Sequence, residues 1–322
     1  MTPQEQPAVR VEQLAKRYGR TLALDGLTMT VERGEVFGFL GPNGAGKTTA
    51  VRLLLGLARP TSGRGEVLGA PLGDRRTRRR IGYLPELFRY QPWLRASEVV
   101  ALHCELAGIP RSAWGRETDD GLGLVGLADR ARDAVGTFSK GMQQRLGLGL
   151  ALIGRPELVV LDEPTSALDP VGRTDVRAII RTIRERGTAV FLNSHLLTEV
   201  ERVCDRVAIV DHGRVRAEGR LDEVLGEPAV RIRATGLDPA ALAPLDAFGP
   251  LRVDGDWLTV EPVDPERVPD IVAAIVTGGG RVHEVDSGRA SLEDRFLALL
   301  SHGSRDTSIE AVAEAAARRT RP

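Results

Sequence analysis

Short apolar runs alternate with helix-length segments along the first 225 residues of the chain. Residues 36–41 (VFGFLG) and 157–164 (ELVVLDEP) contain unbroken apolar runs, as strands do when both faces of a sheet are covered. Residues 187–195 and 206–215 predict two further strands. This alternation is typical of an α/β domain with a largely parallel sheet, and it predicts such a domain over residues 1–225.

Between about residues 88 and 155 the pattern changes to helices, one of them predicted over residues 96–108. After Lys140, apolar side chains recur at spacings of four, four and three residues, which places them on one face of a helix. These side chains are Met142, Leu146, Leu150 and Ile153. We interpret the whole stretch as a helical subdomain inserted into the α/β core.

After about residue 226 the pattern describes a smaller, separate unit. The expected order is strand, helix, hairpin, helix and strand, which is the split βαβ pattern of ferredoxin-like domains. These elements are predicted over residues 229–236, 238–245, 251–262, 265–279 and 281–286. Ser291 and Asp294 have the spacing of a capping box at the start of a last helix. We therefore predict an accessory α+β domain over residues 226–300 and a flexible tail over residues 301–322.

The composition limits the classes of function. A chain of 322 residues is long enough for two domains, and its formal net charge of zero argues against a nucleic-acid partner. Cys104 and Cys204 form no closely spaced pair, which favours a reducing compartment. The first ten residues lack the apolar core of a secretory signal, and no run of about 18 apolar residues could span a membrane. We therefore predict a cytoplasmic protein.

Residues 41–48 (GPNGAGKT) fit the phosphate-loop pattern and lie between a predicted strand and a helix predicted over residues 48–57. In this arrangement backbone N–H groups surround phosphate oxygens at the start of a helix, where the helix dipole favours an anion. We expect Lys47 to contact the β- and γ-phosphates of a nucleotide, and Thr48 to offer its hydroxyl to Mg²⁺. The predicted nucleotide contacts are Gly41, Pro42, Asn43, Gly44, Ala45, Gly46, Lys47, Thr48 and Thr49.

Two carboxylates follow the apolar run of the strand at 157–164. Because ligands of open α/β sheets lie at the carboxyl ends of the strands, we expect Asp162 to reach Mg²⁺. Glu163 lies one residue further on, where it could orient or deprotonate a water molecule. Such a pair can also simply end a strand, but the phosphate loop favours the catalytic interpretation. The two motifs together predict a P-loop NTPase.

A second glycine–lysine stretch narrows this prediction. The lysines of the chain are Lys16, Lys47 and Lys140, and the last lies in FSKGMQQ, at the start of a predicted helix. Ser139 and the backbone N–H groups of Lys140 and Gly141 form a second helix start suited to an anion.

The chain resembles the nucleotide-binding subunit of an ATP-binding-cassette (ABC) transporter over about residues 8–225, and Ser139 to Gln143 resemble the signature motif of that family. The usual motif is Leu-Ser-Gly-Gly-Gln, whereas this chain has Phe-Ser-Lys-Gly-Met followed by Gln143. The variant is similar to the daunorubicin-resistance type of bacterial exporter ATPase, of the ABC-2 class.

The same resemblance implies roles for residues between these motifs. It implies that Tyr18 stacks on adenine, that Glu86 replaces the usual Q-loop glutamine near Mg²⁺, and that His195 senses the γ-phosphate. Residues 166–169 (SALD) match the D-loop. Taken singly, a tyrosine before a glycine or a lone histidine is more often structural, but the order and spacing of the set favour the functional interpretation.

In this family the signature motif of one subunit closes on the nucleotide held by another. The resemblance therefore implies a homodimer of ATPase subunits, in which Ser139, Lys140 and Gly141 contact the partner's nucleotide. Lys140 then either adds positive charge near the γ-phosphate or is a tolerated surface residue.

The resemblance implies an ATP-hydrolysing subunit that drives export through a separate ABC-2-type transmembrane permease and lies on the cytoplasmic face of the membrane through that partner. Phe88, Tyr90 and Trp93 are expected to expose a surface for the permease, or else to form a small core under the helical subdomain. One alternative is a soluble ABC ATPase that acts on ribosomes or DNA, which the single phosphate loop and the neutral charge disfavour. The other is a ligand-sensing regulatory module, although residues 226–300 contain no ligand motif.

Overall fold

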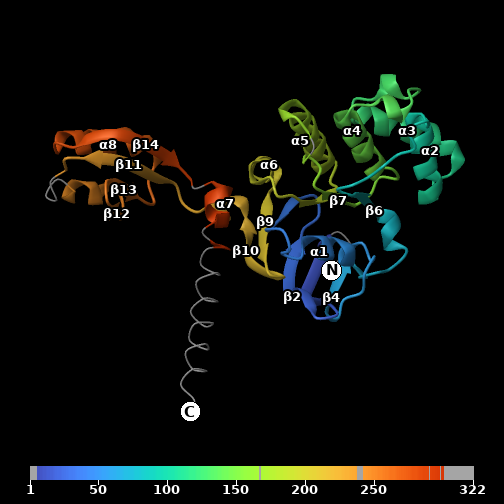
Figure 1. Ribbon diagram of the computed structural model, residues 1–322, viewed down its shortest axis with the longest axis horizontal. Coiled ribbons are helices and arrows are strands. Elements are labelled where there is room, and N and C mark those ends of the chain that lie inside the picture. The colour runs from blue at the N-terminus through green and yellow to red at the C-terminus, as the bar shows by residue number, and fades with distance from the viewer. Residues whose placement is uncertain (1–5, 167, 238–241, 290, 298, 301–322) are drawn as a thin grey trace, which may run out of the picture. The chain divides into compact units, whose positions relative to one another are not determined.

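The computed structural model describes residues 6–166, 168–237, 242–289, 291–297 and 299–300 (Figure 1). The chain divides into two compact units, Met1–Arg220 and Leu221–Pro322. The predicted tail at 301–322 lies outside the described residues.

The first unit is built on a six-stranded sheet in the order β10-β9-β3-β8-β7-β6. The strands are β3 (Val36–Leu40), β6 (Ile81–Leu84), β7 (Leu158–Asp162), β8 (Ala189–Asn193), β9 (Arg206–Asp211) and β10 (Arg214–Arg220). From β9 to β6 all neighbours are parallel, as predicted, and β10 is antiparallel to β9. The single strand predicted over 206–215 was wrong. His212 and Gly213, at φ of 48° and 77°, turn the chain back into a hairpin.

A second, antiparallel sheet in the first unit was not predicted. It has the order β2-β1-β4-β5, with β1 (Val9–Tyr18), β2 (Thr21–Val31), β4 (Ser62–Val67) and β5 (Ala70–Pro71). The signal was an alternation of period two. Leu27, Met29 and Val31 are buried, whereas Thr28 between them is exposed.

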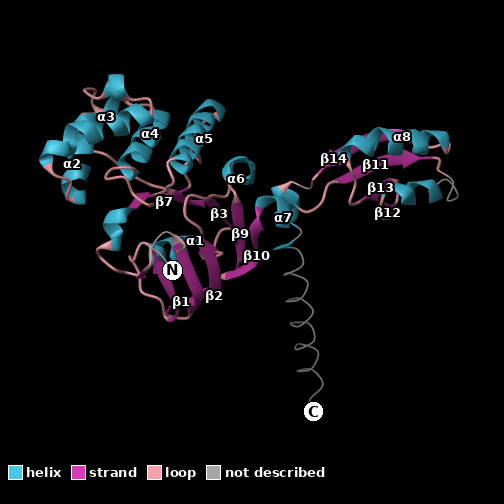
Figure 2. Ribbon diagram, turned by 180° about the vertical axis from the view of Figure 1, so that it is seen from behind, coloured by secondary structure: helices cyan, strands magenta, loops and turns pink. Residues whose placement is uncertain are grey.

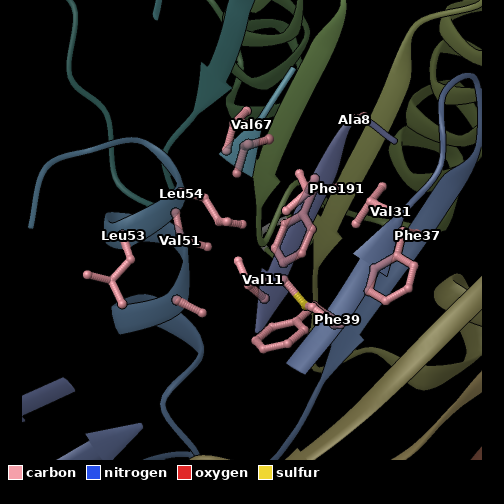
Figure 3. Packing of buried hydrophobic residues seen from close by; sticks show 14 of the residues in the cluster. Ala8, Val11, Val31, Phe37, Phe39, Val51, Leu53, Leu54, Val67 and Phe191 are labelled. Carbon is pink, nitrogen blue, oxygen red and sulfur yellow. The ribbon is translucent and has the colours of Figure 1, made fainter. Parts of the chain in front are cut away.

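The main core lies between this antiparallel sheet, α1 (Lys47–Leu54) and one face of the six-stranded sheet. Figure 3 shows Phe39 and Phe191 beside Val11 of β1, with Val51 of the helix on one side of them and Phe37 near Val31 on the other. The Phe39 and Phe191 ring centroids lie 5.2 Å apart. Burying each such side chain contributes about 1.5–3 kcal/mol, so this layer fixes the loop that joins β3 to α1.

The opposite face of the six-stranded sheet contacts α5 (Pro170–Glu185) at β8 and α6 (Leu197–Val203) at β3 (Figure 2). Gly38 permits the close approach of α6, because a Cβ at this position would lie 2.8 Å from a methyl group of Val200. Both faces of β3 are therefore covered, which explains its unbroken apolar run.

Three helices lie together in the region predicted to be helical: α2 (Ala96–Ala107), α3 (Trp114–Leu124) and α4 (Lys140–Ala151) (Figure 2). The predicted face of α4 is confirmed at Leu146 and Leu150, which are buried. Leu148 is buried as well, so the helix is covered on more than one side. Ile153 lies beyond the last residue of the helix.

The second unit contains an antiparallel sheet in the order β12-β13-β11-β14. Its strands are β11 (Ala229–Thr235), β12 (Leu251–Asp254), β13 (Trp257–Val260) and β14 (Arg281–Gly288), and its helices include α7 (Leu221–Leu225) and α8 (Val268–Thr277). This confirms the predicted strands. Of the helix predicted over 238–245, residues 238–241 lie outside the described part, and a 3₁₀ helix spans Ala243–Phe248. The capping box is confirmed, since the main-chain N–H of Asp294 donates to Oγ of Ser291 at 3.2 Å.

Candidate functional site

The predicted site residues follow the carboxyl ends of four neighbouring parallel strands. The phosphate loop follows β3, Glu86 follows β6, Asp162 ends β7 and is followed by Glu163, and His195 follows β8. Because the strands are parallel and adjacent, these ends meet at one edge of the sheet. A single edge therefore gathers a cationic loop and three carboxylates.

The phosphate loop is held against the core by glycines. Gly46, at φ of 101°, immediately precedes α1, and a Cβ there would lie 2.4 Å from the main-chain oxygen of Ala23. A Cβ at Gly41 would lie 2.3 Å from the oxygen of Val210. The first N–H groups of α1 have no acceptor within the helix, so they are available to an anion.

The remaining loop residues differ in exposure. Asn43, Gly44 and Thr48 are exposed, Pro42 and Thr49 are half-buried, and Ala45 is buried. The hydroxyl of Thr48 thus belongs to the accessible side of the helix start, where it suits a metal ligand.

Lys47 is buried within this loop, and its Nζ donates to the main-chain oxygens of Gly41 at 2.7 Å and Pro42 at 3.2 Å. Burial lowers the pKa of Lys47, while the nearby charges of Glu163, Asp162 and Glu86 raise it. The ammonium therefore lies within electrostatic reach of all three carboxylates.

Asp162 is 5% exposed, and its Oδ1 accepts a hydrogen bond from Nδ2 of Asn193 at 2.5 Å. Burial raises the pKa of Asp162, and the hydrogen bond from Asn193 acts in the opposite direction. A buried carboxylate of this kind gains from a cation at the sheet edge, because the cation replaces lost solvation.

Glu163 has a strained backbone at φ of 54°, in the left-handed region. Its N–H donates to the main-chain oxygen of Asn193 at 2.8 Å, and its Oε2 lies 2.7 Å from Nδ1 of His195. Glu163 is nearly buried, whereas the His195 side chain is 54% exposed. The pair resembles a general base oriented by an imidazole that faces solvent.

Asn193 was missed by the sequence analysis, although it contacts both acids. It is the last residue of β8 and lies opposite Asp162 in the register of β7 and β8. The available signal was a polar residue that ends an otherwise apolar strand beside the Asp162 strand.

Two other predicted residues lie at the ends of strands. Tyr18 ends β1, is 43% exposed, and has the Nζ of Lys16 4.8 Å from its ring centroid. Glu86 is exposed and follows β6. The exposed ring of Tyr18 is compatible with stacking, and the carboxylate of Glu86 with a metal or a water molecule.

The signature motif, Ser139 to Gln143, lies at the start of α4 in the helical part of the unit. Figure 1 shows α4 apart from α1, which follows the phosphate loop. Ser139 is the N-cap of α4, and its Oγ accepts the N–H of Met142 at 3.2 Å. Ser139 and Lys140 are exposed. A Cβ at Gly141 would meet no atom closer than 3.9 Å, so none of the described residues requires a glycine there.

The D-loop match is only partly described, since Ala167 lies outside the described residues. Asp169 is the N-cap of α5, with its Oδ1 accepting the N–H of Gly172 at 2.7 Å. This part of the match thus has a structural role in starting the helix.

The donor set fits a magnesium ion shared with phosphate. Within the described residues, no three His, Cys, Asp or Glu side chains are grouped closely enough to hold a metal by themselves. Mg²⁺ is commonly held by one or two carboxylates together with phosphate oxygens and water, and Thr48, Asp162 and Glu86 supply hard oxygen ligands of that type.

The three aromatic residues after β6, Phe88, Tyr90 and Trp93, differ in burial. The rings of Phe88 and Tyr90 are half-buried, with centroids 5.2 Å apart, and burial raises the pKa of Tyr90. These two rings line a groove beside α2 and α4, so they are partly buried while still contributing to a surface. Trp93 is 72% exposed, as expected.

None of the helices described here is both long and apolar enough to cross a membrane.

Known proteins resemble the chain over most of its length. The family described as "ABC transporter" matches residues 24–166. An uncharacterized ABC transporter ATP-binding protein of Nostoc sp. (strain PCC 7120) is 40% identical over 91% of this chain and 87% of its own. The daunorubicin/doxorubicin resistance ATP-binding protein DrrA of Streptomyces peucetius is 34% identical over 98% of each chain. A solved ATP-binding subunit of an ABC transporter is 30% identical, covers 67% of this chain and 91% of its own, and superposes with a TM-score of 0.61.

Proposed function

Because this chain belongs to the ATP-binding proteins of ABC transporters, we propose that it is the ATPase subunit of an exporter whose membrane partner is an ABC-2-type permease. It binds ATP and hydrolyses it to drive transport through a separate membrane subunit. Under this proposal, residues 1–225 form the nucleotide-binding domain, with the helical subdomain at about 88–155, and residues 226–300 form an accessory domain.

The observation that carries the proposal is the pairing of Glu163 with His195 at the same sheet edge as Lys47 and Asp162. The loop N–H groups and Lys47 bind the phosphates. Thr48, Asp162 and Glu86 would hold Mg²⁺, which supplies positive charge against the phosphate oxygens. Glu163 takes the proton from the attacking water, and the imidazole of His195 holds the carboxylate in place.

The helix start at Ser139 completes the site of a second copy. Ser139 and Lys140 are exposed there, and the start of a helix together with the charge of Lys140 suits a nucleotide held by another chain. We infer a homodimer with two nucleotides at its interface and no nucleic-acid partner.

The groove beside α2 and α4 supports a docking site for the permease. It has a volume of about 710 Å³, and exposed Leu87 and Leu106 contribute apolar surface to it. A cytoplasmic subunit bound there would lie on the inner face of the membrane through its partner.

Glu163→Gln tests the function directly. The amide keeps the shape of the side chain but cannot take a proton, so ATP binding should persist while turnover falls by about 10²–10⁴-fold. The variant should also accumulate as an ATP-bound dimer on size-exclusion chromatography. Exposed Glu185→Gln, at the end of α5, is the matched control and should hydrolyse ATP at the wild-type rate. A Glu163→Gln variant with undiminished hydrolysis would exclude Glu163 as the base.

A further inference from the structure

Asn193 carries a buried acceptor that has no partner. The residue is 2% exposed, and among the side chains that the structure describes its Oδ1 is buried without any hydrogen bond. Its other groups are engaged, with Nδ2 donating to Asp162 at 2.5 Å and the main-chain oxygen accepting the N–H of Glu163 at 2.8 Å.

The orientation of the amide follows from its neighbour. If Oδ1 and Nδ2 were exchanged, an amide oxygen would face a carboxylate oxygen at 2.5 Å, with no proton between them when Asp162 is ionised. Nδ2 must therefore face Asp162, and the unpaired atom is the oxygen.

An acceptor of this kind needs an explanation, because buried polar atoms nearly always have partners. The four preceding residues of β8 are buried and apolar (Ala189, Val190, Phe191 and Leu192). An aliphatic residue at position 193 would continue that pattern without leaving a polar atom unpaired. The amide instead lies at the sheet edge beside the carboxylate of Asp162, while the main-chain oxygen of the same residue accepts the N–H of Glu163.

We propose that Asn193 is a positioning residue for the metal, which orients Asp162 through Nδ2 and accepts a hydrogen bond at Oδ1 from a Mg²⁺-bound water molecule. The inference rests on the proposed function. Mg²⁺ retains several water ligands, and their polarised O–H groups are the donors that this oxygen lacks. Groups that orient metal ligands in this way typically change metal affinity by about 10–100-fold when removed.

Asn193→Leu removes both contacts in a side chain of similar size. Binding of an ATP analogue with an imido group between the β- and γ-phosphorus atoms is titrated at increasing Mg²⁺ concentration and again in excess chelator. The half-saturating Mg²⁺ concentration should rise by about tenfold, while affinity in chelator stays within about twofold of wild type. Leu192→Val, a trimmed neighbour on the same strand, is the control and should leave both values unchanged.

Loss of affinity to the same degree with and without Mg²⁺ would mean that Asn193 is only structural, and an unchanged Mg²⁺ requirement would also overturn the proposal. If Asn193→Leu does not fold, Asn193→Ser must give the same rise, because its hydroxyl is too short to make both contacts. Failure of the wild-type chain to bind nucleotide under either condition would instead overturn the proposed function, and this inference with it.

Discussion

Lys140 lies at a position where its positive charge does not stabilise its own helix. It is the first residue of α4, where the helix dipole disfavours a cation, and the first turn contains no acidic side chain. Its side chain is exposed. Among the described residues Lys140 forms no ion pair, so its charge would gain from an external anion such as the second nucleotide of the proposed dimer.

Lys140→Gly should therefore weaken ATP-driven dimerisation. The exposed charge contributes no more than about 1 kcal/mol, so the ATP concentration giving half-maximal dimer should rise by up to about fivefold at low salt. High salt should reduce this difference, and Lys140→Arg should behave like the wild type because it keeps the charge. Equal midpoints for Lys140→Gly and wild type at low salt would make Lys140 a tolerated surface residue.

Candidate site residues that lie within a recognisable motif could be predicted from the sequence, whereas a residue outside any motif could not. Lys47, Asp162 and Glu163 were predicted because glycines or an apolar strand mark their positions. Asn193 was not, because its contact with Asp162 depends on which strands are neighbours, and strand order is a property of the folded chain. The Glu163–His195 contact joins residues 32 positions apart for the same reason.

At the scale of elements, Glu157 links the starts of β6 and β7 to the turn that precedes β3. It precedes β7, and its carboxylate accepts bonds from Arg80, just before β6, at 2.5 and 2.7 Å. It also accepts a bond from Arg33, in the turn between β2 and β3, at 2.8 Å. The hydrogen bond from Arg80 is the largest cause that lowers the pKa of Glu157, to about 2.

This lowered pKa predicts a loss of stability in acid. The ionised form is favoured by folding, so its contribution is complete above the unfolded pKa near 4.5 and is lost as the pH falls toward 2. Because the side chain is 40% exposed, solvent screening limits the contribution to about 1 kcal/mol. Glu157→Gln should lower the free energy of unfolding by that amount at pH 7 and by almost nothing near pH 2. Urea titrations at both pH values check this, and a difference of equal size at both would show that packing, not charge, is responsible.

Elements with a continuous apolar run were predicted well, and so was the hairpin at 251–262, whereas the β9–β10 hairpin was not. β3, β7 and β8 are buried on both faces, so their composition identifies them. The β9–β10 hairpin was read as one strand because its turn needs a positive φ at His212, which side-chain polarity does not indicate. The antiparallel sheet of β1 and β2 was missed because bulges in β1, such as the one between Val11 and Leu14, shift its alternation.

At the scale of the whole molecule, the two units have separate cores. The nucleotide site belongs to Met1–Arg220, whereas Val230, Ile232, Ile271 and Ile275 pack in a core that consists only of residues of the second unit. A ligand that binds the first unit stabilises only the part of the chain that unfolds together with the binding site. Calorimetry can therefore determine whether the accessory domain is thermodynamically independent.

We expect two unfolding transitions, and Mg·ATP should raise the melting temperature of only one of them. In the Glu163→Gln variant, which should not consume the ligand, ATP at 100 times its dissociation constant adds about 2.7 kcal/mol to the site-containing unit. For a unit of this size, that corresponds to a rise in melting temperature of about 5–10 °C. Ile271→Ala, which opens a cavity beneath α8, should cost about 2–5 kcal/mol and lower only the other transition. If both transitions move with ATP, or if Ile271→Ala lowers the ATP-sensitive one, the two units unfold as one, and the accessory domain is coupled to the nucleotide site.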